Sequence, residues 1–194
     1  MFNFVHIYHI DDVRHAISEN FFLAERDWGY VINYYMNAFP EIKDDMSDED
    51  KELEYFRREF RGIKFDKQGH LIARPFHKFF NWGEKEAEMA HFDFNQPFVI
   101  MDKLDGSMMH PMRVDGKILW CSKMGPTDVA EQVARFVEAH PAYIKLADDL
   151  VAQGYTPIFE WVSRQQRIVV DYPVDNLILT AVRNMKTGEY IPYK

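Results

Sequence analysis

The sequence predicts one domain of the α+β class, with a mostly helical region over residues 1–60 and antiparallel strands over residues 61–194. Two observations support this prediction. The 194 residues, 47% hydrophobic and 15% aromatic, suffice to bury one sizeable core. Helical spacing and a capping signal occur before residue 60, whereas short apolar runs separated by turn residues follow Gly62.

The first region is expected to hold helices. Residues 11–27 carry apolar side chains at partly helical spacing, and the aromatic segment 30–39 could continue that helix. The acidic residues 41–50 form a solvated connection. Ser47 can cap a helix over residues 48–59, whose first turn carries carboxylates suited to the helix dipole.

Short strands are expected after Gly62. The apolar runs favour strands at residues 63–65, 71–73, 98–103, 107–113 and 118–122. The turn at residues 114–117 contains Asp115-Gly116, a pair that suits a tight hairpin.

Two helices and further strands complete the prediction. Thr127 caps a helix that runs to about His140, and a second helix follows to Gln153 and ends at Gly154. Residues 158–163 and 167–172 are expected to pair as a hairpin, before a strand at 177–184 and a turn at 186–188.

Composition and charge narrow the class of protein. The single cysteine, Cys121, excludes a disulfide framework and a multi-cysteine zinc site, and it suits a small buried side chain in a reducing, cytoplasmic compartment. No apolar run approaches the roughly 20 residues of a membrane span, so we expect no membrane partner. The net charge of −8 disfavours a general nucleic-acid coating protein, although it permits a local basic cleft.

The run from Lys103 to Ser107, Lys-Leu-Asp-Gly-Ser, is the strongest candidate for chemistry. A lysine becomes a nucleophile only after it loses a proton, and its ordinary pKa of about 10.4 must be lowered by burial or nearby cations. We expect Lys103 at the end of a strand. The competing interpretation is an ordinary strand followed by a turn.

Several segments carry a resemblance to a known family. Residues 101–107 resemble motif I of the covalent nucleotidyltransferases, the superfamily of ATP-dependent RNA and DNA ligases and mRNA capping enzymes. Residues 159–163 and 167–172 resemble motif III and its following strand. The pair Arg61-Gly62 and the run 73–84 are similar to elements of the bacteriophage tRNA-repair RNA ligases. Ser122-Lys123 resembles motif Ia of those ligases, and residues 181–184 and 187–190 resemble the segment after motif III.

The resemblance implies the nucleotidyltransferase, ATP-grasp-like ligase fold, in which antiparallel sheets form a nucleotide cleft. It implies that Lys103 attacks the α-phosphorus of ATP to give a lysyl-adenylate. AMP would then pass to an RNA 5′-phosphate, and a 3′-hydroxyl would displace it and seal the strand. The compartment would be the host cytoplasm if a phage encodes the protein.

The resemblance also implies roles for the other residues. Arg61 and Lys78 would hold the β- and γ-phosphates, and Lys123 would add positive charge near the cleft. Glu160 would take a ribose hydroxyl or a water on Mg²⁺, which is expected as a cofactor beside ATP. Asp105 would orient the lysine or bind a metal water, and Gly106 would permit a tight turn beside the nucleotide.

Each assignment has a structural alternative. Lys78 could extend from an aromatic cluster, Arg61 could pair with the acidic helix before it, and Lys123 could be an ordinary exposed lysine. A non-catalytic nucleotide- or RNA-binding relic of the fold is the alternative function. A DNA ligase or capping enzyme is the competitor among enzymes.

The sequence departs from the family pattern near its end. Family members continue to a Glu-Gly motif IV and to a motif V with two lysines, and neither precedes Lys194. The sequence is therefore expected to hold only the N-terminal part of an adenylyltransferase domain. Three explanations for the missing motifs are open: a split enzyme whose second chain supplies them, a truncated chain, or a nucleotide-binding relic of the fold.

Overall fold

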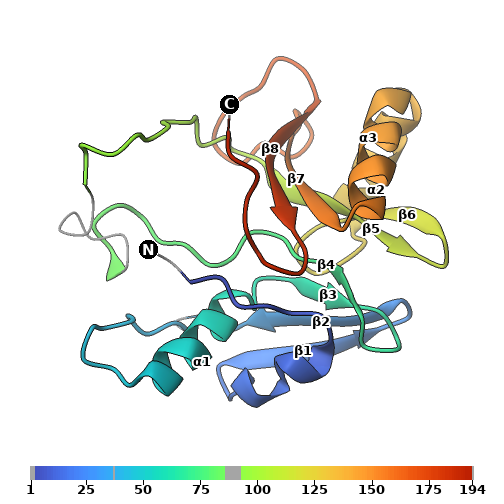
Figure 1. Ribbon diagram of the computed structural model, residues 1–194. Coiled ribbons are helices and arrows are strands. Elements are labelled where there is room, and N and C mark those ends of the chain that lie inside the picture. Colours follow the sequence, from blue (N-terminus) through green and yellow to red (C-terminus); the bar gives the residue numbers. More distant parts are fainter. Residues whose placement is uncertain (1–2, 37, 86–92, 194) are drawn as a thin grey trace.

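The computed structural model describes residues 3–36, 38–85 and 93–193 and contains two four-stranded antiparallel sheets (Figure 1). The first sheet has the order β1-β2-β3-β4. Its strands are β1 (Phe21–Arg26), β2 (Gly29–Tyr34), β3 (Ile63–Phe65) and β4 (Leu71–Ala73). The second sheet has the order β6-β5-β7-β8. Its strands are β5 (Ser107–Val114), β6 (Lys117–Cys121), β7 (Tyr155–Val162) and β8 (Asn176–Asn184).

The prediction of a mostly helical region over residues 1–60 is wrong for its first half. Residues 11–27 form two short 3-10 turns (Ile10–Asp12 and Arg14–Ala16) followed by β1, and the first half of segment 30–39 belongs to β2. Aromatic and β-branched side chains favour strands, and pairing of β2 with β3 fixes this hairpin in place. Gly29 has φ +146°, and a Cβ there would lie 2.0 Å from the carbonyl oxygen of Phe65.

The helix predicted from residue 48 is confirmed as α1 (Asp48–Arg58). The Ser47 side chain accepts a hydrogen bond from the Asp50 backbone N–H at 3.1 Å, as expected of an N-cap. Phe56 of α1 packs with Phe21, Ile32 and Ile63 in the core beneath the first sheet.

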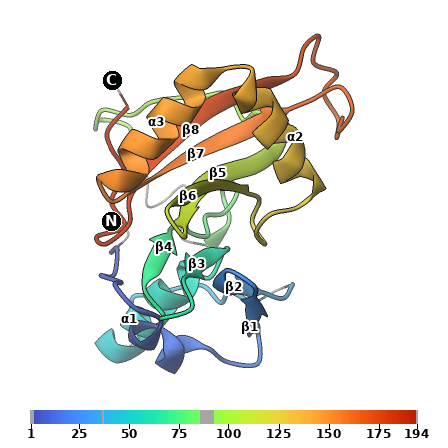
Figure 2. The ribbon, with the colours of Figure 1, turned by 90° about the vertical axis from the view of Figure 1, so that its right-hand side faces the viewer.

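Two helices cover one face of the second sheet (Figure 2). They are α2 (Asp128–Glu138) and α3 (Pro141–Ala152), close to their predicted bounds. The hairpin at Asp115-Gly116 is also confirmed, because both residues have positive φ, +48° and +76°. Phe159 and Trp161 of β7 pack toward the helices with Val133 and Val137. Side chains alternate along a strand, so the other face of β7 is left to form a site.

Two predicted strands are absent from the described chain. Residues 98–103 run as irregular backbone with exposed apolar side chains, and Ile100 is 86% exposed. Residues 167–172 belong to a bent loop, so the predicted hairpin is replaced by pairing of β7 with β8. The amides of Val169 and Val170 donate to the Asp105 side chain, which removes them from any strand ladder.

The two sheets meet at buried contacts. Ala73 of β4 packs with Met112 of β5 and Cys121 of β6, which confirms Cys121 as a buried side chain. A buried ionic cluster lies nearby, in which Glu59 contacts the guanidinium groups of Arg74 at 2.9 Å and Arg183 at 2.7 Å. None of the helices in the described ranges has the length and apolarity needed to cross a lipid bilayer.

Candidate active site

A cavity of about 790 Å³ contains Lys103 and three other residues that the sequence singled out. These are Arg61, Gly106 and Glu160. Residues from β5, β7 and β8 line it, together with parts of segments 76–79, 101–106 and 190–193. The structure therefore brings together four of the seven predicted nucleotide-binding residues.

Lys103 is exposed and lies on the irregular segment that leads into β5, four residues before the strand begins. The prediction that it ends a strand is therefore wrong. Backbone outside a ladder lets the lysine face the cavity instead of following the side-chain alternation of a strand.

Glu160 reaches the cavity through the alternation of β7. Its neighbours Phe159 and Trp161 point toward α2 and α3, so Glu160 points to the opposite face. Its Oε1 accepts a hydrogen bond from the Gly106 backbone N–H at 3.0 Å. Burial raises the pKa of the Glu160 carboxyl, and the Gly106 amide, Lys103 and Arg61 partly oppose that rise.

Gly106 is required by close packing. A Cβ at this position would lie 2.2 Å from the carbonyl oxygen of Trp161, a distance that no real side chain tolerates. The glycine thus brings the segment that carries Lys103 directly against β7, which is what places Lys103 and Glu160 in one cavity.

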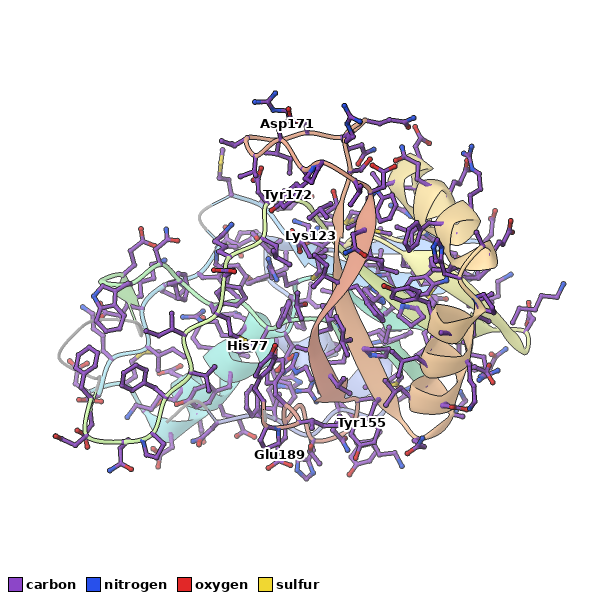
Figure 3. The ribbon with its side chains drawn as sticks, turned by 90° about the horizontal axis from the view of Figure 1, so that it is seen from above. His77, Lys123, Tyr155, Asp171, Tyr172 and Glu189 are labelled. Carbon is purple, nitrogen blue, oxygen red and sulfur yellow. The ribbon has the colours of Figure 1, made fainter. Side chains whose placement is uncertain are left out.

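Asp105 is not among the residues that line the cavity, and its carboxylate binds the backbone of the loop after β7. Its Oδ2 accepts hydrogen bonds from the N–H groups of Val169 and Val170, each at 2.7 Å. The Val170 and Val169 amides together lower the pKa of the Asp105 carboxyl. Its own N–H donates to the hydroxyl of Tyr172 at 2.9 Å, and Figure 3 shows Tyr172 on the loop after β7. Asp105 therefore ties the Lys103 segment to loop 164–175.

Arg61 lies between α1 and β3 in the chain. Its guanidinium lies 5.3 Å from the ring centroid of Phe79, and its Nη1 lies 3.9 Å from the sulfur of Met108. Both of these neighbours line the cavity. Contacts with an aromatic face and a thioether leave the guanidinium's hydrogen-bonding capacity available to an anion.

Lys78 and Lys123 lie outside this cavity and share a different neighbour, Tyr34. The Nζ atoms of Lys78 and Lys123 lie 5.8 and 4.8 Å from the Tyr34 ring centroid. Lys78 lines a second cavity of about 570 Å³ with Tyr34, Phe39, Phe80 and Lys85. Lys78 is therefore surrounded by aromatic side chains, as the structural alternative expected. One of these rings, Tyr34, also lies beside Lys123.

The sequence did not predict the apolar wall of the main cavity. This wall includes Phe76, Phe79, Met108, Tyr190 and Tyr193. His77 donates its backbone N–H to the Tyr190 hydroxyl at 3.2 Å, and its Nδ1 lies 2.9 Å from the same oxygen. The resemblance had identified segments 73–84 and 187–190 separately. That the two segments contact each other through His77 and Tyr190 follows only from the fold.

The carboxylates around the cavity are few. Asp102 and Glu160 line it, and the described part of the chain contains no group of three or more His, Cys, Asp or Glu side chains suited to hold a metal. Such a donor set fits Mg²⁺ held mainly by phosphate oxygens and water, with one carboxylate in support.

Comparison with known proteins identifies a family and several relatives that are described as RNA ligases. A family model described as RNA ligase matches residues 59–194. The chain is 37% identical to a candidate RNA ligase of Thermovibrio ammonificans, over 70% of this chain and 36% of that protein. It is 31% identical to RNA ligase 1 of bacteriophage TS2126 and 28% identical to an RNA ligase of Rhodothermus phage RM378, over 69% and 64% of this chain.

The chain spans 36–40% of the length of these three relatives. The matched region begins at Glu59 and includes Arg61, Lys103 and Glu160, which meet in the main cavity. Because the family model covers well over half of the residues, the chain belongs to the RNA ligase family.

Proposed function

We propose that this chain is the adenylyltransferase part of an ATP-dependent RNA ligase and that Lys103 is its nucleophile. The observation that carries the proposal is the main cavity, where Lys103 lies with Arg61 and Glu160 beside an apolar and aromatic wall. Such a wall suits a nucleobase, and the charged residues suit its phosphates and ribose.

In the proposed first step, the deprotonated Nζ of Lys103 attacks the α-phosphorus of ATP. A P–N bond forms as the bond between the α-phosphorus and the bridging oxygen breaks, and pyrophosphate leaves. AMP then passes to an RNA 5′-phosphate, and a 3′-hydroxyl displaces it to form a phosphodiester. Each step depends mainly on positioning and on neutralising phosphate charge.

The phosphate-binding roles fall to three cations. Arg61 lies in the main cavity, and Lys78 and Lys123 converge on Tyr34. Gly62, which directly follows Arg61, lies against the backbone of Lys123. These contacts connect the two groups of cations, so we assign the β- and γ-phosphates to them and the α-phosphate to Lys103.

Glu160 would receive the ribose or a metal-bound water, because its side chain lines the cavity and is held there by the hydrogen bond from the Gly106 N–H to its Oε1. Mg²⁺, when bound, would neutralise phosphate charge at this point. Segments beyond the matched third of the relatives, on this or a second chain, would contribute further cations. The natural partners would be RNA ends that carry a 5′-phosphate and a 3′-hydroxyl.

The test is covalent labelling. The protein is incubated with Mg²⁺ and α-labelled ATP, with and without a polypeptide carrying a Glu-Gly segment and a paired-lysine strand. We expect label on the wild-type protein and on Lys117→Ala, an exposed lysine in the β5–β6 hairpin, and none on Lys103→Ala.

Binding of ATP without label under both conditions would contradict the proposal and favour a non-catalytic nucleotide-binding protein. Sealing assays then compare nicked RNA with nicked DNA. Preferential sealing of DNA would assign the chain to a different ligase class.

A further inference from the structure

Lys64 is a fully buried lysine of β3 that the proposed reaction does not use. Its Nζ donates to the carbonyl oxygens of Gly62 at 2.8 Å and Lys123 at 3.0 Å, and lies 3.2 Å from that of Ser122. It also lies 3.0 Å from Nε2 of His110. An ammonium has three N–H donors, so these four acceptors saturate it.

His110 is suited to accept from Lys64. Its Nδ1 lies 3.3 Å from the carbonyl oxygen of Pro111, which fits a proton on Nδ1 and a lone pair on Nε2. Burial, together with Lys64, holds the pKa of His110 well below its usual value, so the ring is neutral. Burial also lowers the pKa of Lys64 to about 8.

Gly62 gives independent evidence that the backbone after Arg61 packs closely against the backbone of Lys123. Its φ is +91°, and a Cβ there would lie 2.3 Å from the Lys123 carbonyl oxygen. The turn that carries Lys123 is closed by backbone hydrogen bonds between Ser122 and Gly125, at 2.9 and 3.2 Å. A buried cation therefore lies at the point where the Arg61 segment meets the Lys123 turn.

We infer that Lys64 is a positioning residue for the proposed reaction: its ammonium holds the backbone beside Arg61 against that of Lys123 and so fixes the spacing of these two phosphate-binding cations. The inference rests on the proposed function, because it assigns the leaving phosphates to Arg61 and Lys123. Lys64 acts through these residues, since its own donors are occupied by protein acceptors.

The experiment measures the affinity of inorganic pyrophosphate by calorimetry for the wild type, Lys64→Met, Lys123→Ala and the double variant. Lys67→Met, the same change at an exposed lysine three residues away, is the matched control. We expect Lys64→Met to weaken binding about tenfold and Lys67→Met to leave it unchanged. In the Lys123→Ala background, Lys64→Met should have little further effect, because coupled residues are not additive.

Unchanged affinity in Lys64→Met, an undiminished effect in the Lys123→Ala background, or a wild type that does not bind pyrophosphate would overturn the inference. If the wild type binds pyrophosphate but takes no label from ATP, the proposed function is contradicted. The comparison of pyrophosphate affinities among the variants still tests the role of Lys64. If Lys64→Met does not fold, Lys64→Gln, which keeps two N–H donors, takes its place and must show the same dependence on Lys123.

Discussion

The imidazole of His77 is kept neutral by its surroundings beside the main cavity. Burial lowers its pKa to about 4, and the nearby Arg183 guanidinium acts in the same direction. In the unfolded chain the ring takes up a proton near its ordinary pKa of 6.5. Between these two values the unfolded state binds more protons, so the folded state loses stability as the pH falls from about 6.5 to about 4.

We expect His77→Gln to be less sensitive to acid than the wild type. The pKa difference corresponds to about 2 kcal/mol of folding free energy lost between pH 7 and pH 5. Urea unfolding at both pH values should show a fall smaller by about that amount in His77→Gln. Replacement of the exposed His6 by Gln is the control, and an equal fall in His77→Gln and wild type would contradict the assignment.

Sequence patterns identified several site residues without the structure. The local run identified Lys103 as a candidate, the resemblance identified Glu160, and both residues line the main cavity. The structure adds a contact that no local pattern predicted, the hydrogen bond from the N–H of Gly106 to Glu160, 54 residues away. The partners of Lys64 and His77 could not be predicted, because a buried lysine or histidine has no local pattern that names its acceptors.

At the scale of elements, loop 164–175 is held by side chains from outside it. It was predicted as a turn and a strand, and β-branched residues at 168–170 support that prediction locally. Tertiary contacts decide otherwise, since Asp105 binds two consecutive amides there and Tyr172 binds the Asp105 amide. These hydrogen bonds join the loop to the segment that carries Lys103.

Asp105→Asn should release this loop. An amide side chain accepts more weakly than a carboxylate, so hydrogen exchange at the Val169 and Val170 amides should accelerate roughly tenfold. Asp171→Asn, in the same loop and paired only at the surface with Arg167 at 3.7 Å, should leave exchange at those amides unchanged. Equal exchange rates in Asp105→Asn and the wild type would show that the loop is held by other contacts.

At the scale of the whole molecule, Glu59 joins parts of the chain that are far apart in sequence. It receives Arg74 from the end of the first sheet and Arg183 from β8, and all three side chains are buried. Burial alone would raise the pKa of Glu59, but Arg183 and Arg74 outweigh it and lower the pKa to about 2. The stability that this contributes is present above pH 4.5 and is lost as the pH falls toward 2.

Glu59→Gln should destabilise the fold strongly, because it leaves two buried guanidinium groups without their anion. The expected loss is about 3–5 kcal/mol in the free energy of unfolding at pH 7, measured by denaturant unfolding. Tryptophan fluorescence, to which Trp120 and Trp161 of the second sheet contribute, and exchange at the β2 amides of the first sheet should both report the loss of stability. Glu131→Gln, at an exposed pair with Arg135, is the control with little expected effect. A similarly small effect of Glu59→Gln would refute a central role for the cluster.

The sequence by itself determined the features that depend on near neighbours along the chain. These include the capped helix α1, the tight turn at Asp115-Gly116 and the two helices after Thr127. Only the tertiary structure decided that residues 21–34 form strands, that Asp105 holds a loop, and that Lys78 and Lys123 share Tyr34 while Lys103 lies in another cavity. The physical reason is that strand pairing and buried polar contacts join residues distant in sequence, and they override local preference where the two disagree.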